Sequence, residues 1–348
     1  MALFGLGGSK TTVGVDIGSG LVKLVEIQHG KEPVITKAYA APMLPDAIVE
    51  GEIMDPSVVA DAVRGLFQTA GVKQKKVVVA VGGRDVIIRK IQVDRMKESD
   101  AYEVVRWEAQ QHIPFDIEGV ELDFQVLDPE GESIQMDVLL VAAKKELVET
   151  KTALLAEAGL EPAIVDVDAF ALHNAFEVNY PEAMDGVAAL VHIGHEVTNI
   201  NLLYNGVPLL TRDLSVGTRK FREDLQRERG LSAEDAEAML RGFERTPELD
   251  PYVQNRGEEI AIGVERAVAF LQSSSREAGA IQKAYCSGGG ARIPGLAEVL
   301  GDRLRVPIEV ADPLRAIRVK EGAFGTVPVD ELAPLMMLAV GLALRKLN

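Results

Sequence analysis

The sequence feature that most constrains the fold is an internal repeat. Residues 15–30 align without a gap on residues 191–206, and Gly18 matches Gly194. Apolar and polar positions largely alternate in both copies, as strands with one buried face require. Each copy predicts two strands joined by a tight glycine turn, then a third strand after a second turn. Two unrelated hairpins could look alike by coincidence, but a duplicated α/β domain with a cleft between its copies explains the repeat better.

The segments that follow the two hairpins also correspond. The first copy continues with a strand, a helix and a buried β-branched strand, at residues 33–40, 56–69 and 76–81. The second continues with a strand, a helix and a strand, at residues 207–212, from about Gly217, and at residues 283–287. A chain of 348 residues is long enough for two or three domains of this kind.

Two insertions interrupt the copies. The first is predicted as a small α+β subdomain, with strands at residues 123–127 and 136–142 and helices at residues 99–111 and 145–158. Within it, Val104, Trp107 and Gln111 share one helical face, which we expect to pack in the core of the subdomain. The second insertion is rich in helix, with Ser232 as an expected N-cap.

The predicted domain boundaries follow from these patterns. Domain one comprises residues 1–87 and 163–186 and a closing C-terminal helix in residues 326–348, and its inserted subdomain comprises residues 88–162. Domain two comprises residues 187–221 and 281–325, with a helical subdomain in residues 222–280.

Composition narrows the classes of partner. The formal charge of −16 repels nucleic acid and anionic lipid, so neither is an expected partner. The single Cys286 cannot form an internal disulfide, and the N-terminus has no secretory signal pattern, which favours a cytoplasmic location. The longest apolar stretch, residues 335–344, is half of the ~20 residues that a membrane-spanning helix needs. We therefore expect no direct membrane insertion.

Three glycine-rich turns are candidates for phosphate binding, because glycine lets backbone N–H groups approach an anion closely. They contain Gly18 and Gly20, Gly194, and the run from Gly288 to Gly290. The internal repeat would bring both hairpin turns to one cleft, where they could hold phosphates from opposite sides. The triple-glycine turn would then approach the nucleoside.

Other nucleotide and catalytic motifs are incomplete. The segment 5–11 is similar to a P-loop, but Ser9 stands where glycine is required, so we expect a flexible N-terminal arm. The run from Gly288 lacks the third glycine of a dinucleotide-binding loop, because Ile293 occupies that position. The histidines lack metal-ligand spacing, and no Ser/His/Asp or Cys/His arrangement is evident.

These features and four further segments resemble known families. The hairpins, the triple glycine and the two insertions resemble the actin, sugar-kinase and heat-shock chaperone superfamily, and the place of the first insertion resembles that in the cell-division protein FtsA. Residues 106–115, 137–146, 159–170 and 198–201 resemble the PilM family, the cytoplasmic actin-like components of type IV pilus assembly. The resemblance covers nearly the whole chain.

The resemblance implies a fold, cofactors and a partner. The fold would be α/β, with duplicated actin-like (ribonuclease-H-like) domains around a cleft that holds ATP and Mg²⁺. The partner would be the short cytoplasmic N-terminal tail of the membrane protein PilN, docked beside the inserted subdomain. This partner would hold the protein at the cytoplasmic face of the inner membrane, where it would serve pilus assembly and twitching motility. Since the sequence ends after the closing helix, we expect recruitment through a partner, and self-association is compatible with the family.

The resemblance also implies roles for residues of the first hairpin and the third turn. Asp16 would hold the magnesium ion, and Gly18, Ser19 and Gly20 would donate hydrogen bonds to the terminal phosphates. Lys23 would contact phosphate, although it could equally be a solvated strand lysine. Asp16 could instead cap its turn. The remaining expected nucleotide contacts are Gly194, His195, Gly217, Lys220, Gly288, Gly289 and Gly290, although Lys220 could lie on a solvated helix face.

The second hairpin departs from the hydrolytic members of the superfamily. His192 stands where those members carry an aspartate that helps to hold the metal and the attacking water. Asp166 or Asp168 falls near the water-orienting position, although Asp168 could instead be a helix N-cap. We assign no catalytic residue and expect at most slow ATPase activity.

The sequence is compatible with two classes of function. One is an ATP-binding scaffold that binds the PilN tail. The alternative is an ATPase or phosphotransferase of the sugar-kinase and actin kind, or an adaptor similar to FtsA in cell division.

Overall fold

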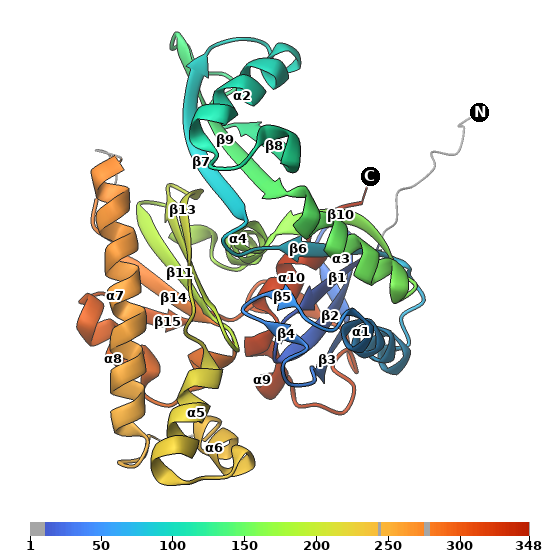
Figure 1. Cartoon of the computed structure of the whole chain (residues 1–348), viewed down its shortest axis with the longest axis vertical. Coiled ribbons are helices and arrows are strands. Elements are labelled where there is room, and N and C mark those ends of the chain that lie inside the picture. The colour runs from blue at the N-terminus through green and yellow to red at the C-terminus, as the bar shows by residue number, and fades with distance from the viewer. Residues whose placement is uncertain (1–10, 243–244, 275–278, 348) are drawn as a thin grey trace.

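The computed structural model describes residues 11–242, 245–274 and 279–347. The predicted N-terminal arm lies outside these residues. The chain builds two mixed sheets that share one topology, with a third, smaller sheet standing above the first domain in Figure 1. No helix within the described residues is both long and apolar enough to span a bilayer.

The first sheet belongs to domain one and has six strands in the order β10-β6-β1-β2-β3-β16. Its antiparallel meander is β1 (Thr11–Ile17), β2 (Leu21–Gln28) and β3 (Val34–Pro42). The strands β6 (Lys76–Val81) and β10 (Glu161–Val167) add in parallel on one side, and β16 (Arg318–Val319) adds on the other.

The second sheet repeats this topology in domain two, in the order β13-β12-β11-β14-β15. The meander is β11 (Val187–Ile193), β12 (Thr198–Tyr204) and β13 (Val207–Leu214). The parallel strands β14 (Lys283–Ser287) and β15 (Ile308–Val310) follow. The predicted duplication is therefore confirmed.

The two hairpin turns also match in detail. The Gly18 N–H donates to the Leu21 carbonyl at 3.1 Å, and the Gly194 N–H donates to the Val197 carbonyl at 2.9 Å. The repeat therefore extends to the hydrogen bonds that close each turn.

Helices cover both domains. In domain one, α1 (Pro56–Ala70) begins where the Asp55 side chain accepts from the Val58 N–H, and it ends at Gly71, whose φ is 59°. The other helices of this domain are α3 (Lys145–Glu157), α4 (Asp168–Asn179), α9 (Val329–Leu332) and α10 (Met337–Ala343). Domain two carries α5 (Thr218–Arg229), α6 (Ala233–Leu240), α7 (Asp250–Ser274) and α8 (Leu296–Leu304). Ser232 caps α6, as expected.

The C-terminal helix α10 closes domain one. A Cβ atom at Gly341 would lie 1.7 Å from the Ala171 carbonyl oxygen of α4, and one at Gly14 of β1 would lie 2.5 Å from the Ala339 oxygen. Only glycine permits such close contacts between backbones, so α10 is held tightly between α4 and the sheet.

One core joins the two domains at their base. The ring centroids of Phe176, on α4, and Tyr285, on β14, lie 4.6 Å apart, and Tyr180 stacks on Phe176. These rings belong to a buried cluster that draws residues from both sheets. The shared core packs one domain against the other below the cleft.

The inserted subdomain stands at the top of Figure 1. Its antiparallel sheet has the order β7-β9-β8, from β7 (Val86–Asp94), β8 (Val120–Val126) and β9 (Gln135–Lys144), and α2 (Glu98–His112) covers one face. Short segments complete the chain: the strands β4 (Ile48–Val49) and β5 (Glu52–Ile53), and 3₁₀ turns at residues 117–119, 181–183, 289–292 and 333–335.

Two expectations for this subdomain are wrong. Trp107 is 61% exposed and Val104 36%, because α2 buries the opposite face, through Ala101, Val105 and Ala109. Alanine lets the helix approach the sheet closely, and the bulkier Trp107 then points to solvent. In addition, the predicted subdomain includes α3, but Leu154 and Leu155 of α3 pack in the core of domain one with α1.

Candidate functional site

A cavity of about 1160 Å³ lies between the two domains. This volume exceeds the ~300–1,000 Å³ usual for a ligand pocket, so a nucleotide would fit. It is lined by most of the residues that the sequence analysis selected: Asp16, Gly18, Ser19, Gly20, Lys23, His192, Gly194, His195, Gly288 and Gly289.

The two hairpin turns meet across this cavity. A Cβ atom at Gly20 would lie 2.8 Å from Cγ of His195, so the first turn touches the second. The α5 helix is anchored beside them, because the Thr218 N–H donates to the Gly194 carbonyl at 3.0 Å. Domain one and domain two therefore each present a glycine turn to one space.

The triple-glycine turn contains two kinds of glycine. A Cβ atom at Gly288, whose φ is +84°, would lie 2.5 Å from the Ile193 carbonyl oxygen, and one at Gly290 would lie 2.1 Å from the Ile193 side chain. These two glycines permit close packing of β14 on β11. Gly289 is different, since a Cβ atom there would have only ordinary contacts, at 3.7 Å from Leu335 and 3.8 Å from Thr218. It is the open position of the turn.

Three selected residues do not line the cavity. Gly290 and Gly217 are packing positions, and a Cβ atom at Gly217 would lie 2.4 Å from the His195 carbonyl oxygen. Lys220 is also outside the lining, whereas Arg222, on the same helix, lies within it. The helix α5 begins at Thr218, close to the predicted start, and the side chain of Arg222, two residues after Lys220, is the one that lines the cavity.

Asp16 and Lys23 form a mostly buried ion pair in the first hairpin. Lys23 Nζ donates to Asp16 Oδ2 at 2.6 Å, and the two residues are cross-strand partners. No group of three or more acidic, histidine or cysteine side chains in the described residues is placed to hold a metal ion. A magnesium site of the kind expected does not need one, because Mg²⁺ usually binds one or two carboxylates together with phosphate oxygens and water. Asp16 and Asp168 both line the cavity and fit that requirement.

His192 is neutral at pH 7. Burial, and then the charge of Lys23, lower its pKa to about 4 against the opposite effect of Asp16. Its Nδ1 is hydrogen bonded to the Ser287 hydroxyl at 2.9 Å. His192 therefore contributes no negative charge to the cavity.

Of the two aspartates near the expected water-orienting position, Asp168 lines the cavity and Asp166 does not. Asp166 lies 3.4 Å from the Arg345 guanidinium instead. Asp168 is the first residue of α4, whose N-cap is Val167 without a side-chain hydrogen bond, so the expectation of an Asp168 N-cap is wrong. Burial, and then the charge of Asp16, raise the pKa of Asp168 to about 7.

Because the pKa of Asp168 is raised in the folded protein, its ionisation should lower the free energy of unfolding as pH rises. As pH rises from 4 to 7, the unfolded state loses the Asp168 proton first, so stability falls across that range. We expect Asp168→Asn to raise the free energy of unfolding by up to about 4 kcal/mol at pH 8, and by little at pH 4. Urea unfolding without nucleotide measures this, with the exposed Asp302→Asn as the control. Equal effects of Asp168→Asn at both pH values would contradict the assignment.

A polar bridge that no sequence pattern predicts joins the two domains at the cavity. Arg219 of α5 donates to Glu196 at 2.7 Å and to Asp46 of domain one at 3.0 Å. The Glu50 N–H of domain one also donates to Glu196, at 2.6 Å. These contacts link the second hairpin turn to the loop around β4, so they hold the two domains together above the shared core.

A second candidate surface lies at the seam between the inserted sheet and domain one. Ile88 and Leu139, on the face of the sheet opposite α2, pack against Val167 and Ala169 at the start of α4. Half-buried apolar residues extend the seam: Val86, Leu127, Val141 and Phe170. The seam therefore combines an apolar floor with partly open apolar edges.

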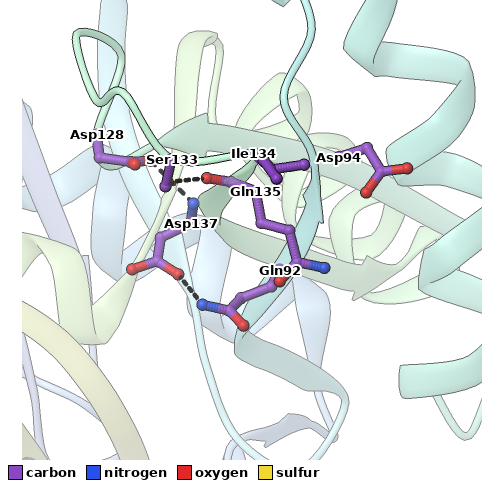
Figure 2. A pocket seen from close by; sticks show the side chains of 7 residues that line it. All are labelled: Gln92, Asp94, Asp128, Ser133, Ile134, Gln135 and Asp137. Atoms are coloured by element: carbon purple, nitrogen blue, oxygen red, sulfur yellow. Dashed lines mark hydrogen bonds between the residues drawn. The ribbon is translucent and has the colours of Figure 1, made fainter.

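Farther along the same sheet lies a polar hollow of about 460 Å³, shown in Figure 2. Asp137 accepts from Gln92 at 2.9 Å and pairs with Lys90, and Asp128 pairs with Arg95. Two of its three carboxylates are thus already neutralised by the protein. The hollow is a weaker candidate than the apolar seam for binding a partner.

Comparison with known proteins identifies relatives. The family model described as "Type IV pilus assembly protein PilM" matches residues 14–347. A solved PilM–PilN type IV pilus biogenesis complex contains a chain that is 31% identical, with a TM-score of 0.84, and the match covers 97% of this chain and 98% of that one.

More distant structures share the fold. The ethanolamine utilization protein EutJ of Carboxydothermus hydrogenoformans is 18% identical, with a TM-score of 0.58, over 96% of this chain and 89% of its own. MreB 5 of Spiroplasma citri, solved with bound AMPPNP, is 12% identical, with a TM-score of 0.54, over 96% and 95%. The duplicated actin-like fold is therefore confirmed.

Proposed function

Because the chain belongs to the PilM family of type IV pilus assembly proteins, we propose that it is an ATP-binding scaffold that binds the cytoplasmic tail of PilN. The protein itself would remain on the cytoplasmic side, and PilN would hold it at the inner membrane. The observation that carries the nucleotide assignment is the meeting of the two repeated glycine turns, where Gly20 faces His195 at the cavity.

The side chains and backbone N–H groups that line the cavity suit a nucleoside triphosphate with magnesium. The Ser19 hydroxyl, Lys23 and the backbone N–H groups of the turns would bind the phosphates, and Asp16 would hold the ion together with phosphate oxygens and water. Magnesium would neutralise charge on the phosphates. Gly289 leaves room beside the turn for the nucleoside.

The assignment as a scaffold rests on the second hairpin. A neutral His192 cannot supply the second carboxylate that orients metal and water for in-line attack, whereas phosphate binding by backbone N–H groups does not need it. Binding should therefore persist where turnover is slow.

One observation favours the alternative, a slow ATPase. Asp168 lines the cavity with a pKa of about 7, which suits a general base at physiological pH. Of the two aspartates near the expected water-orienting position, Asp168 alone lines the cavity, so we expect any hydrolysis to depend on it.

We expect His192→Asp to raise the rate of phosphate release by about tenfold or more, because it restores a carboxylate at the metal and water position. The affinity for ATP should change much less. Single-turnover hydrolysis of radiolabelled ATP measures the rate, and the exposed His112→Asp variant is the matched control. An unchanged rate in His192→Asp would mean that another feature limits hydrolysis.

For the partner, the apolar seam between the inserted sheet and α4 is the proposed docking site. An extended peptide could place side chains between Phe170 and Val141 and form backbone hydrogen bonds along a strand edge. The PilM–PilN complex among the solved relatives supports PilN as the source of that peptide. A pull-down with an immobilised PilN tail, with nucleotide release from denatured protein in parallel, tests both parts of the proposal.

A further inference from the structure

Helix α3 connects the inserted subdomain to the cavity. Strand β9 ends at Lys144 and α3 begins at Lys145, with no loop between them. Since β9 is the central strand of the inserted sheet, α3 is a direct continuation of that sheet. At 1.5 Å rise per residue, Lys151 lies only ~9 Å along the helix from its first residue.

The two faces of α3 have different surroundings. Leu154, Leu155 and the following Ala158 are buried in the core of domain one, together with α1. Leu147 and Lys151, four residues apart on another face, line the cavity between the domains. The core contacts thus fix the helix so that Lys151 faces the cavity.

Lys151 lines the cavity with its side chain half-buried. Burial lowers the pKa of Lys151, against the smaller opposing effect of the Asp168 and Asp16 charges. Within the part of the chain that the structure describes, its ammonium makes no hydrogen bond or ion pair, whereas Lys23 is paired with Asp16. An ammonium has three donors, and Lys151 lines the same cavity as Asp16, Asp168 and the glycine turns.

We propose that Lys151 binds the terminal phosphate of a nucleoside triphosphate and thereby couples the nucleotide state to the inserted subdomain. This inference rests on the proposed nucleotide binding at the same cavity. A terminal phosphate attracts the ammonium because it carries the most negative charge of the three phosphates. Because α3 and β9 are continuous, a contact between Lys151 and this phosphate would restrain both elements.

Calorimetric titration with Mg-ATP and with Mg-ADP tests the phosphate contact. We expect Lys151→Met to weaken ATP binding about tenfold or more, as for the loss of one charge-assisted hydrogen bond, and to change ADP binding less than about twofold. Lys151→Arg, which keeps the charge, should retain most of the preference for ATP. The exposed Lys73→Met is the matched control.

The outcomes separate this inference from the proposed function. If the wild-type protein binds neither nucleotide, the proposed function fails. If the wild type binds both and Lys151→Met weakens ATP and ADP equally, or neither, then Lys151 does not contact the terminal phosphate and the inference is overturned.

Amide hydrogen exchange tests the coupling. In the wild type, replacing ADP by ATP should slow exchange in α3 and β9, and in Lys151→Met at saturating nucleotide this difference should be lost. A difference between the two nucleotides that persists unchanged in the variant would overturn the coupling.

Discussion

Gly289→Val is expected to abolish the binding of Mg-ATP while leaving the protein folded. A Cβ atom at Gly289 would have only ordinary contacts with Leu335 and Thr218, so the protein can accommodate the valine. Its methyl groups would enter the cavity beside the phosphate turns, in space that the nucleotide requires. We expect the affinity for ATP to fall at least about a hundredfold in calorimetric titration.

The neighbouring glycines make this test selective. Gly65→Val is the matched control, because Gly65 lies on α1 and a Cβ atom there would have no neighbour within 4 Å. Gly290→Val is unsuitable, since its Cβ atom would lie 2.1 Å from Ile193 and would destabilise the core. Unchanged ATP binding by a folded Gly289→Val protein would show that the nucleotide does not occupy this part of the cavity.

Removal of the inserted subdomain is expected to abolish binding of the PilN tail and to preserve nucleotide binding. Val86 and Ala143 are cross-strand partners on β7 and β9, so an Asn-Gly turn can replace residues 87–142 and join them as a hairpin. The phosphate turns lie in the two repeated sheets and are untouched. A pull-down with the PilN tail measures the loss, and calorimetry with Mg-ATP provides the control for folding.

Point variants test the same docking site without removing the subdomain. They are needed because the excision would expose the apolar side chains of Val167 and Ala169 to solvent. Phe170→Ser removes a half-buried apolar group from the seam and should weaken binding of the PilN tail about tenfold or more. Trp107→Ser removes a larger, 61% exposed aromatic group from the outer face of α2 and should have little effect. The opposite pattern would move the docking site to the outer face of the subdomain.

The duplicated fold and most of the residues that line the cavity could be predicted, because they depend on residues that are close together in the sequence. A strand that reverses through a tight turn needs glycine at a fixed place, and the repeat carried Gly18 and Gly194 at equivalent places. The alternation of apolar and polar residues predicted the strands of both hairpins. The cavity lies where the turns of these two hairpins meet.

Contacts between distant segments could not be predicted in the same way. Trp107 and Val105 are both apolar residues on one helix, and only the approach of the sheet decides which is buried. The bridge from Arg219 to Asp46 joins residues of different domains, and no spacing in the sequence marks it. Lys151 likewise looks like any lysine on a surface helix until the core contacts of α3 orient it toward the cavity.

A glycine can have either of two structural roles, and the sequence alone does not distinguish them. Gly217 and Gly290 are glycines because backbone or side chains pack against them, whereas Gly289 faces open space in the cavity. All three have the same appearance in a motif. The surroundings of the Cβ position distinguish a packing glycine from one that leaves room for a ligand.

The most direct test of the central claim is a crystal structure of the wild-type protein grown with Mg-ATP. We predict nucleotide density between the turns of Gly18–Gly20 and Gly194–His195, with the metal ion nearest Asp16 and the nucleoside beside Gly289. An empty cavity at saturating Mg-ATP, or a nucleotide bound elsewhere on the molecule, would show that ATP does not bind between the two glycine turns.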